Sequence, residues 1–253
     1  MASIGRLGSW QSVQAAGVEY QAVAGKRPGW QELSERYPQD RDCLASFLVL
    51  ELAEVLQGEK PANLVCLANK RRSCGRNLYL LWREHGQALL QESGLKVRVL
   101  ADRGSSVLLL LYCPVALGSL LGQKSVHVIL GKAGYQEPAD QGKVLSELEK
   151  RMAGEGFPHE IGVFLGYPLK DVVGFMGWAQ LSFTCQGPWK IFGNPAESLR
   201  LAETHRECRC RISRQLAAGC DPHDCLKAAT RFKAAVPTTR GVFYQPDGSG
   251  YLT

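Results

Sequence analysis

The stretch FPHEIGVFLGYPLKDVVGFMG, residues 157–177, predicts two short helices joined by a Gly-Tyr-Pro corner. Gly166 can end the first helix, because glycine takes up the left-handed cap conformation without steric cost. Pro168 cannot continue a helix but can begin one, and Pro158 can open the first helix in the same way. Apolar residues recur at the spacing of a buried helical stripe, at Ile161, Phe164, Leu165, Leu169, Val172, Val173 and Met176.

Strands and helices alternate on the N-terminal side of this stretch. Residues 95–101 and 107–112 predict a hairpin, and the second run is apolar on both faces, as in a central strand. Residues 62–67 predict a buried strand, and residues 126–130 fit either a helix or a strand. Helices are expected over 40–57, 77–93, 114–121 and 138–153.

On the C-terminal side, residues 181–184 and 189–192 predict short strands around a Gln-Gly-Pro turn. A helix follows from Asn194 and Pro195 through residue 205, with a continuation to 217 left open. We therefore expect an α/β or α+β fold with a small mixed sheet flanked by helices. The expected organisation is an irregular N-terminal arm (1–38), a single domain (39–205) and a Cys/His-rich, basic helical tail with a loose C-terminus (206–253).

Composition indicates an ordinary globular protein. The 253 residues are 45% hydrophobic and 21% charged, with a formal net charge of +6. The most apolar run, residues 107–122, contains Pro114 and Gly118 and is shorter than the roughly 20 residues that span a bilayer. The opening MASIGRLGSW lacks the pattern of a secretory signal, and nine cysteines without an export signal predict reduced thiols. We expect a cytoplasmic protein without a membrane partner.

Three segments resemble one bacterial family. They are AEVLQGEKPANLVCL from Ala53, the PHEIGVFLGYPLKDVVGF run, and GPWKIFGNPAESLRLAETHREC from Gly187. Together they look like the signature of the DUF3793 family, over roughly residues 40 to 210. The resemblance implies a bacterial origin but no mechanism, since the family is defined by sequence alone.

His159 and Glu160 are the first candidate catalytic residues. A histidine at a helix N-terminus resists protonation, so its neutral imidazole can act as a base or as a metal ligand. The alternative is that both residues cap the helix, because Glu160 can accept hydrogen bonds from first-turn amides. Cys113, at the end of the central strand, is the best-placed cysteine for a nucleophile, although a packing role fits it as well.

A cluster in the tail contains six residues of metal-ligand type: His205, Cys208, Cys210, Cys220, His223 and Cys225. Thiolates and imidazoles bind zinc, and thiolates alone hold iron–sulfur clusters. The spacing departs from paired Cys-x-x-Cys patterns, so ordinary reduced cysteines are the competing interpretation.

Trp189 and Lys190, with Tyr167 of the corner, are candidate ligand-binding residues. Aromatic rings beside a lysine suit a flat or anionic ligand, whereas a short strand with Trp189 in the core is the alternative. The clusters Lys70-Arg71-Arg72 and Arg206-Arg209-Arg211-Arg214 could contact nucleic-acid phosphates, although such runs are often solvated faces.

The leading hypothesis is a ligand- or metal-binding protein linked to metal or redox handling. Two alternatives stay open, an enzyme that uses His159 with a cysteine nucleophile, and a protein that binds nucleic acid or a phosphate ligand through its basic clusters.

Overall fold

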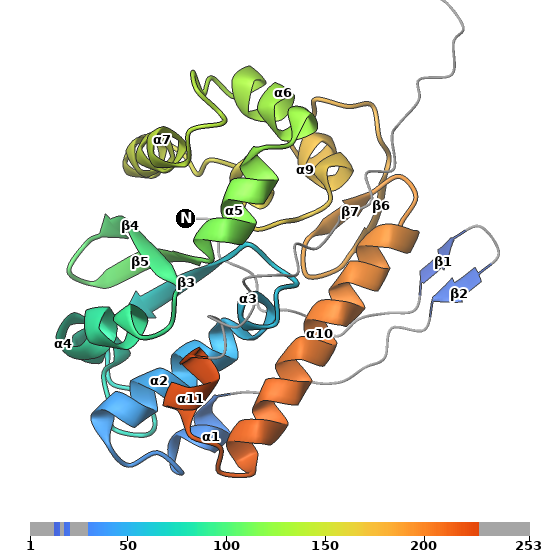
Figure 1. Ribbon diagram of the computed structural model, residues 1–253. Helices are drawn as coiled ribbons and strands as arrows, with labels where there is room; N and C mark the ends of the chain where they lie inside the picture. Colours follow the sequence, from blue (N-terminus) through green and yellow to red (C-terminus); the bar gives the residue numbers. More distant parts are fainter. Residues whose placement is uncertain (1–12, 16–17, 21–29, 228–253) are drawn as a thin grey trace, which may run out of the picture.

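The computed structural model describes residues 13–15, 18–20 and 30–227 (Figure 1). The helices are α1 (Gln31–Ser34), α2 (Asp40–Glu51), α3 (Ala53–Leu56), α4 (Leu78–Gln91), α5 (Pro114–Leu121), α6 (Lys124–Lys132), α7 (Gln141–Ala153), α8 (Ile161–Phe164), α9 (Leu169–Phe175), α10 (Ala196–Ala217) and α11 (Pro222–Lys227). The strands are β1 (Val13–Ala15), β2 (Val18–Tyr20), β3 (Ala62–Ala68), β4 (Lys96–Asp102), β5 (Ser106–Tyr112), β6 (Phe183–Gln186) and β7 (Lys190–Phe192). This mixture of helices and small sheets confirms the predicted fold class in its α+β form.

The largest sheet has the strand order β3-β5-β4, and both pairings are antiparallel. The predicted hairpin is confirmed, because β4 and β5 are neighbours joined by a tight turn at Gly104. The apolar strand β5 is central, as its two-sided pattern predicted. Lys96 of β4 and Ala62 of β3 are both paired with Tyr112. The first residues of β3 and β4 therefore lie level with the last residue of β5 at one end of the sheet.

Strand β5 separates two hydrophobic cores. Its odd-numbered residues Val107, Leu109 and Leu111 pack in a first core with α2, α3 and α4. Its even-numbered residues Leu110 and Tyr112 pack in a second core with the helices from α5 to α9. Figure 1 shows the sheet between these two layers of helices, with α2 and α4 on one side and α5 and α7 on the other. The alternation follows directly from the two-residue repeat of a strand.

A third, small core lies under the β6–β7 hairpin. Cys185, Trp189 and Ile191 of the hairpin region pack there against Ala202 of the long helix α10. Tyr167 of the Gly-Tyr-Pro corner contacts both this core and the second one. The corner therefore joins the hairpin and α10 to the rest of the fold.

The corner has the predicted Gly166 helix stop, with a φ of 70°. Helix α8, however, begins only at Ile161, with Glu160 as its N-cap residue. His159 therefore precedes the helix instead of lying in its first turn. The amide of Ile161 donates to the carbonyl of Pro158 at 3.1 Å, so Pro158 opens a turn that leads into the helix.

Several further expectations can be compared with the fold. Residues 126–130 are helical and belong to α6. Helix α10 runs without a break past residue 205 to Ala217, so it crosses the expected boundary between the domain and the tail at residue 206. In the N-terminal arm, Trp30 is buried against Phe47 and donates a hydrogen bond to Ser46 at 3.1 Å. Residues 1–12 of the expected arm and residues 228–253 of the expected tail lie outside the described residues.

We predict that Gly166→Ala lowers the free energy of unfolding by about 2–5 kcal/mol. A left-handed residue with a side chain costs about 1–2 kcal/mol, and overpacking adds about 1–3 kcal/mol. A Cβ atom at this position would lie 2.7 Å from Cδ of Pro61. Urea unfolding measures the change.

The matched control is Gly177→Ala. Gly177 also has a φ of 70°, but a Cβ atom there meets no atom within 4 Å. The difference between the two variants isolates the contact with Pro61. Equal losses would show that this contact contributes nothing to the stability of the corner.

Candidate functional site

A group of buried polar side chains, together with the half-buried Glu51, lies where α10 packs against α2 and α3. We call this group the polar seam, and its members are Glu51, Glu54, Lys60, Asn63, His205 and Arg209. Glu51 and Glu54 lie near the junction of α2 and α3, and Lys60 precedes β3. His205 and Arg209 are four residues apart on α10, so they share one helix face.

Part of the seam is a connected chain of hydrogen bonds. The ammonium of Lys60 donates to Oδ1 of Asn63 at 2.8 Å, and Nδ2 of Asn63 donates to the backbone carbonyl of Glu51 at 2.5 Å. The carboxylate of Glu51 forms an ion pair with Nη2 of Arg209. These contacts tie the start of β3 to the end of α2 and to the middle of α10.

Two oppositely charged residues of the seam have buried atoms without a hydrogen-bond partner in the described part of the chain. They are Glu54, through Oε2, and Arg209, through Nε and Nη1. The two residues are only 6% and 4% exposed, and their helices pack against each other. Leaving such a group unsatisfied costs about 1–3 kcal/mol, and most buried polar groups in proteins are paired. This pair of exceptions is the strongest indication of a binding site.

Two aromatic residues border the seam. The rings of Tyr167 and Trp189 are stacked, with centroids 4.5 Å apart. The ammonium of Lys60 lies 5.3 Å from the centroid of Tyr167, and the ring of His205 meets Trp189 edge-on at 6.0 Å. Of the predicted ligand-binding residues, Tyr167 and Trp189 therefore come together at the seam. Lys190 does not, because it is exposed and its ammonium lies over the ring of Phe175.

Asp171 holds this aromatic wall in place. Its carboxylate is 1% exposed and accepts hydrogen bonds from Trp189 Nε1 at 2.8 Å and from the amide of Phe192 at 2.9 Å. Ser198 of α10 donates a third bond at 2.6 Å, and Lys170 forms an ion pair at 2.7 Å. Because each of these donors lies within 2.9 Å of the carboxylate, we interpret this network as structural. It holds Trp189 in place beside the seam.

The predicted catalytic residues His159, Glu160 and Cys113 do not come together. Glu160 points into the protein, where it accepts hydrogen bonds from Tyr135 at 3.3 Å and Arg151 at 3.4 Å. His159 is exposed, and its ring contacts Phe157 and Phe175. Cys113 is the N-cap residue of α5 and packs against the first core. The hydrogen bonds of Glu160 thus serve the structure and do not involve His159 or Cys113.

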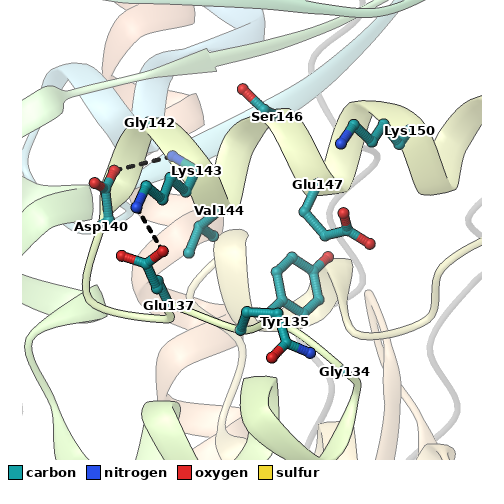
Figure 2. A pocket seen from close by; sticks show the side chains of 11 residues that line it. Gly134, Tyr135, Glu137, Asp140, Gly142, Lys143, Val144, Ser146, Glu147 and Lys150 are labelled. Carbon is teal, nitrogen blue, oxygen red and sulfur yellow. Dashed lines mark hydrogen bonds and ion pairs between the residues drawn. The ribbon is translucent and has the colours of Figure 1, made fainter.

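A pocket of about 460 Å³ lies between α7 and the loop that precedes it. Figure 2 shows Lys143 in contact with Glu137 and Asp140, whereas Glu147 and Lys150 have no marked partner among the residues drawn. The ammonium of Lys143 contacts Glu137 at 2.5 Å, while the amide of Lys143 donates to Asp140 at 2.9 Å. Burial, and secondarily the charge of Glu160, raises the pKa of Tyr135 at its base. Because the ion pair of Lys143 and Glu137 is largely exposed to solvent, this pocket is a weaker candidate than the seam.

The six predicted metal ligands are distributed over several places. Within the described residues, no group of three or more His, Cys, Asp or Glu side chains could hold a metal ion. Cys208 is buried at the contact between α10 and α3, whereas Cys210 is half-buried and accepts a weak hydrogen bond from Arg206. His205 lies against Trp189, as described above.

The remaining three predicted ligands lie around α11. His223 pairs with Asp42 at 2.9 Å, and Cys225 packs against the first core. Cys220 is exposed, and its backbone carbonyl accepts a hydrogen bond from Tyr37 at 3.0 Å. Burial raises the pKa of the Cys225 thiol, which disfavours the thiolate form that binds metal.

Many residues of the basic clusters are already paired. In the second cluster, Arg206 pairs with Glu203, Arg209 pairs with Glu51, and Arg211 donates a hydrogen bond to Gln57. Arg72 lies over the rings of Trp30 and Phe47. These contacts reduce the number of side chains that could bind phosphates. No described helix combines the length and the apolar character needed to cross a membrane.

The comparison with protein families finds one matching model, DUF3793, a protein of unknown function, over residues 48–226. The chain belongs to the DUF3793 family. Searches of curated proteins and of solved structures found no match. The resemblance deduced from the sequence is thus confirmed.

The three segments that carry the DUF3793 resemblance meet at the seam. The first segment contributes Glu54, Lys60 and Asn63, and the third contributes Trp189 and His205. The second contributes Tyr167 and Asp171. The three segments therefore come together at or beside the seam, although the seam residues Glu51 and Arg209 lie just outside them.

Sequence reasoning missed Glu54 and Asp171 as site residues, and it named Arg209 only as a possible phosphate contact. Glu54 lies within a buried run of α3, between Ala53 and Val55. A charge on an apolar helix face is the signal that could have found them, since charged residues are rarely buried without a partner. The identity of that partner depends on tertiary contacts.

We predict that Asp171→Asn lowers the free energy of unfolding by on the order of 3 kcal/mol. The substitution removes the negative charge that pairs with Lys170. It also replaces one carboxylate oxygen by an NH2 group, which would face the donors that now bind Asp171. Urea unfolding followed by tryptophan fluorescence measures the loss. Asp140→Asn is the control, because Asp140 is an exposed helix N-cap and asparagine caps equally well. A loss below 1 kcal/mol for Asp171→Asn would contradict the structural role.

We also predict that Cys208 makes stability depend on alkaline pH. Burial, followed by the charges of Glu59 and Glu54, raises the pKa of its thiol from 9.0 to about 11. The unfolded chain releases this proton first, so stability is complete below pH 9 and declines as the pH rises toward 11. The wild-type protein should lose on the order of 2 kcal/mol more than Cys208→Ala over this range.

Urea unfolding at pH 8, 9, 10 and 11 provides this comparison. Cys66→Ala, which removes an exposed thiol on β3, is the control and should follow the wild type. If the free energies of unfolding of the wild type and Cys208→Ala fall in parallel from pH 8 to pH 11, the raised pKa of Cys208 is contradicted.

Proposed function

We propose that this DUF3793 protein binds a small polar ligand at the polar seam. The observation that carries the proposal is the buried pair Glu54 and Arg209, whose atoms Oε2, Nε and Nη1 have no hydrogen-bond partner in the described residues. A fold that buries opposite charges on adjacent helices without pairing them directly leaves room in its hydrogen-bond network for a third group. A ligand that stays bound removes the free-energy cost of those unsatisfied atoms.

The unsatisfied atoms define the chemistry of the ligand. Arg209 offers N–H donors at two nitrogen atoms, Nε and Nη1, each of which suits a carboxylate or phosphate oxygen. Oε2 of Glu54 needs a donor, such as an ammonium or a hydroxyl group. The ligand class is therefore a small molecule with an anionic group and a hydrogen-bond donor, of which amino acids and hydroxy acids are the simplest members.

The borders of the seam supply a rigid frame for such a ligand. Glu51 holds Arg209 through the ion pair, and the Asp171 network holds Trp189. Gln57 spans the seam toward solvent, because its Nε2 donates to the carbonyl of Cys208 at 2.9 Å and its Oε1 accepts from Arg211 at 2.6 Å. Rotation of this side chain is the proposed route of access.

The ligand-binding part of the initial hypothesis is the part that we retain. The metal part has less support, since the six predicted ligands do not gather within the described residues. The enzyme alternative loses its proposed pair, because Cys113 and His159 pack in different surroundings. A cytosolic, bacterial setting remains part of the proposal, because small anionic metabolites are abundant there.

Native mass spectrometry of the untagged protein, purified without denaturation, tests the proposal. We expect a bound mass of metabolite size, lost on denaturation, and a rise in melting temperature when the identified compound is added back. Glu54→Gln should weaken binding by at least about tenfold, while the free energy of unfolding stays within about 1 kcal/mol, because Oε2 makes no hydrogen bond that the substitution would break.

Glu51→Gln is the contrasting variant. It removes the partner of a buried guanidinium and should cost about 3 kcal/mol of stability. If no compound copurifies, and a panel of amino acids, hydroxy acids and sugar phosphates leaves the melting temperature unchanged, the proposal is wrong. Equal destabilisation by Glu54→Gln and Glu51→Gln would likewise assign the seam a purely structural role.

A further inference from the structure

The charges of the polar seam sum to zero. Glu51 and Glu54 contribute two carboxylates, and Lys60 and Arg209 contribute one ammonium and one guanidinium. All four side chains are buried except that of Glu51, which is half-buried. His205 adds no charge at pH 8, where an imidazole is neutral. The seam therefore holds as many positive as negative charges before any ligand binds.

Exposed charges next to the seam do not supply an excess of positive charge. Burial raises the pKa of the Cys208 thiol most, the carboxylates of Glu59, Glu54 and Glu207 raise it further, and Arg211 lowers it. Glu59 and Glu207 are exposed, as is Arg211. Two exposed carboxylates and one exposed guanidinium thus act at this end of the seam, so a net anion gains no attraction from them.

This balance of charges sets the net charge that suits a ligand. Burying an ion without a counter-ion is strongly unfavourable. A hydroxy acid or a sugar phosphate would add negative charge to the seam, and a simple amine would add positive charge. A zwitterion adds one charge of each sign and leaves the sum at zero.

The unsatisfied atoms of the seam select the same class of ligand. Among the described residues, Nε and Nη1 of Arg209 lack an acceptor, and Oε2 of Glu54 lacks a donor. Charge-assisted hydrogen bonds are stronger than those of neutral groups, so an ammonium satisfies the carboxylate better than a hydroxyl group does. An α-amino acid carries its ammonium and its carboxylate on one carbon atom, and it would lie between α3 and α10, which pack against each other.

We propose that the ligand of the polar seam is an α-amino acid bound as a zwitterion. Its carboxylate accepts hydrogen bonds from Arg209, and its ammonium donates to Oε2 of Glu54. This inference rests on the proposed function and narrows it, because it removes hydroxy acids, sugar phosphates and simple amines from the ligand class.

Matched ligands test this inference with the full-length protein at pH 8. The twenty protein amino acids and glucose 6-phosphate are first ranked by the rise in melting temperature that each produces. Calorimetry then gives the dissociation constants of the best amino acid, of the 2-hydroxy acid with the same side chain, and of the amine that lacks its carboxylate. The hydroxy acid and the amine should each bind at least about tenfold more weakly, because each leaves one charge of the seam uncompensated.

The variant Glu54→Gln should change this preference. The substitution leaves the seam with one excess positive charge, which a hydroxy acid neutralises and an amino acid does not. The preference for the amino acid over its hydroxy acid should therefore fall at least about tenfold. Glu59→Gln is the matched control, since it removes an exposed carboxylate that is screened by salt, and it should change the preference by less than about twofold.

The contrary outcomes separate this inference from the proposed function. A hydroxy acid or glucose 6-phosphate that binds more tightly than every amino acid, and that Glu54→Gln weakens, would overturn the inference and leave a ligand at the seam. A preference that Glu54→Gln does not change would overturn the contact between the ammonium and Glu54. If none of these compounds binds, the inference is wrong, and the proposed function fails with it when no compound copurifies either. If Glu54→Gln does not fold, the ranking of the three matched compounds by the wild type decides.

Discussion

The buried carboxylate of Asp171 is the interaction on which the C-terminal half of the fold depends. It accepts hydrogen bonds from the hairpin through Trp189 and Phe192 and from α10 through Ser198, with Lys170 as its counter-ion. A carboxylate of this kind is stable inside a protein only when its hydrogen-bonding capacity is fully used. Satisfying it requires α9, β7 and the start of α10 to meet at one point.

The meeting point has consequences further along α10. Once Ser198 is fixed, the helix runs along α3 and α2, where His205 and Arg209 are buried and Arg209 forms an ion pair with Glu51. The Asp171 network is saturated with donors, whereas the neighbouring seam is not. One helix thus contributes to a structural network at its start and to the proposed ligand site at its middle. The Asp171 network therefore makes the surroundings rigid, while the polar seam beside it keeps hydrogen-bonding atoms available for a ligand.

Much of the fold could be predicted from local patterns. The alternation in residues 95–101, the apolar run at 107–112 and the glycine stop at Gly166 each depend on neighbouring residues only, and the corresponding elements were found. The position of His159, before the helix, was not predicted correctly from the sequence. Whether Pro158 begins a turn or a helix depends on the tertiary contacts of Glu160 with Tyr135 and Arg151. Candidate site residues were the least predictable. Tyr167 and Trp189 were found, but Glu54 and Arg209 become notable only when two helices distant in sequence pack together.

A crystal structure at about 1.5 Å resolution of the protein purified with its natural small molecules would test the central claim most directly. The account predicts polyatomic density between Glu54 and Arg209, with an acceptor facing the guanidinium and a donor facing Oε2 of the carboxylate. A direct ion pair between the two side chains, or isolated water molecules alone at these atoms, would contradict it.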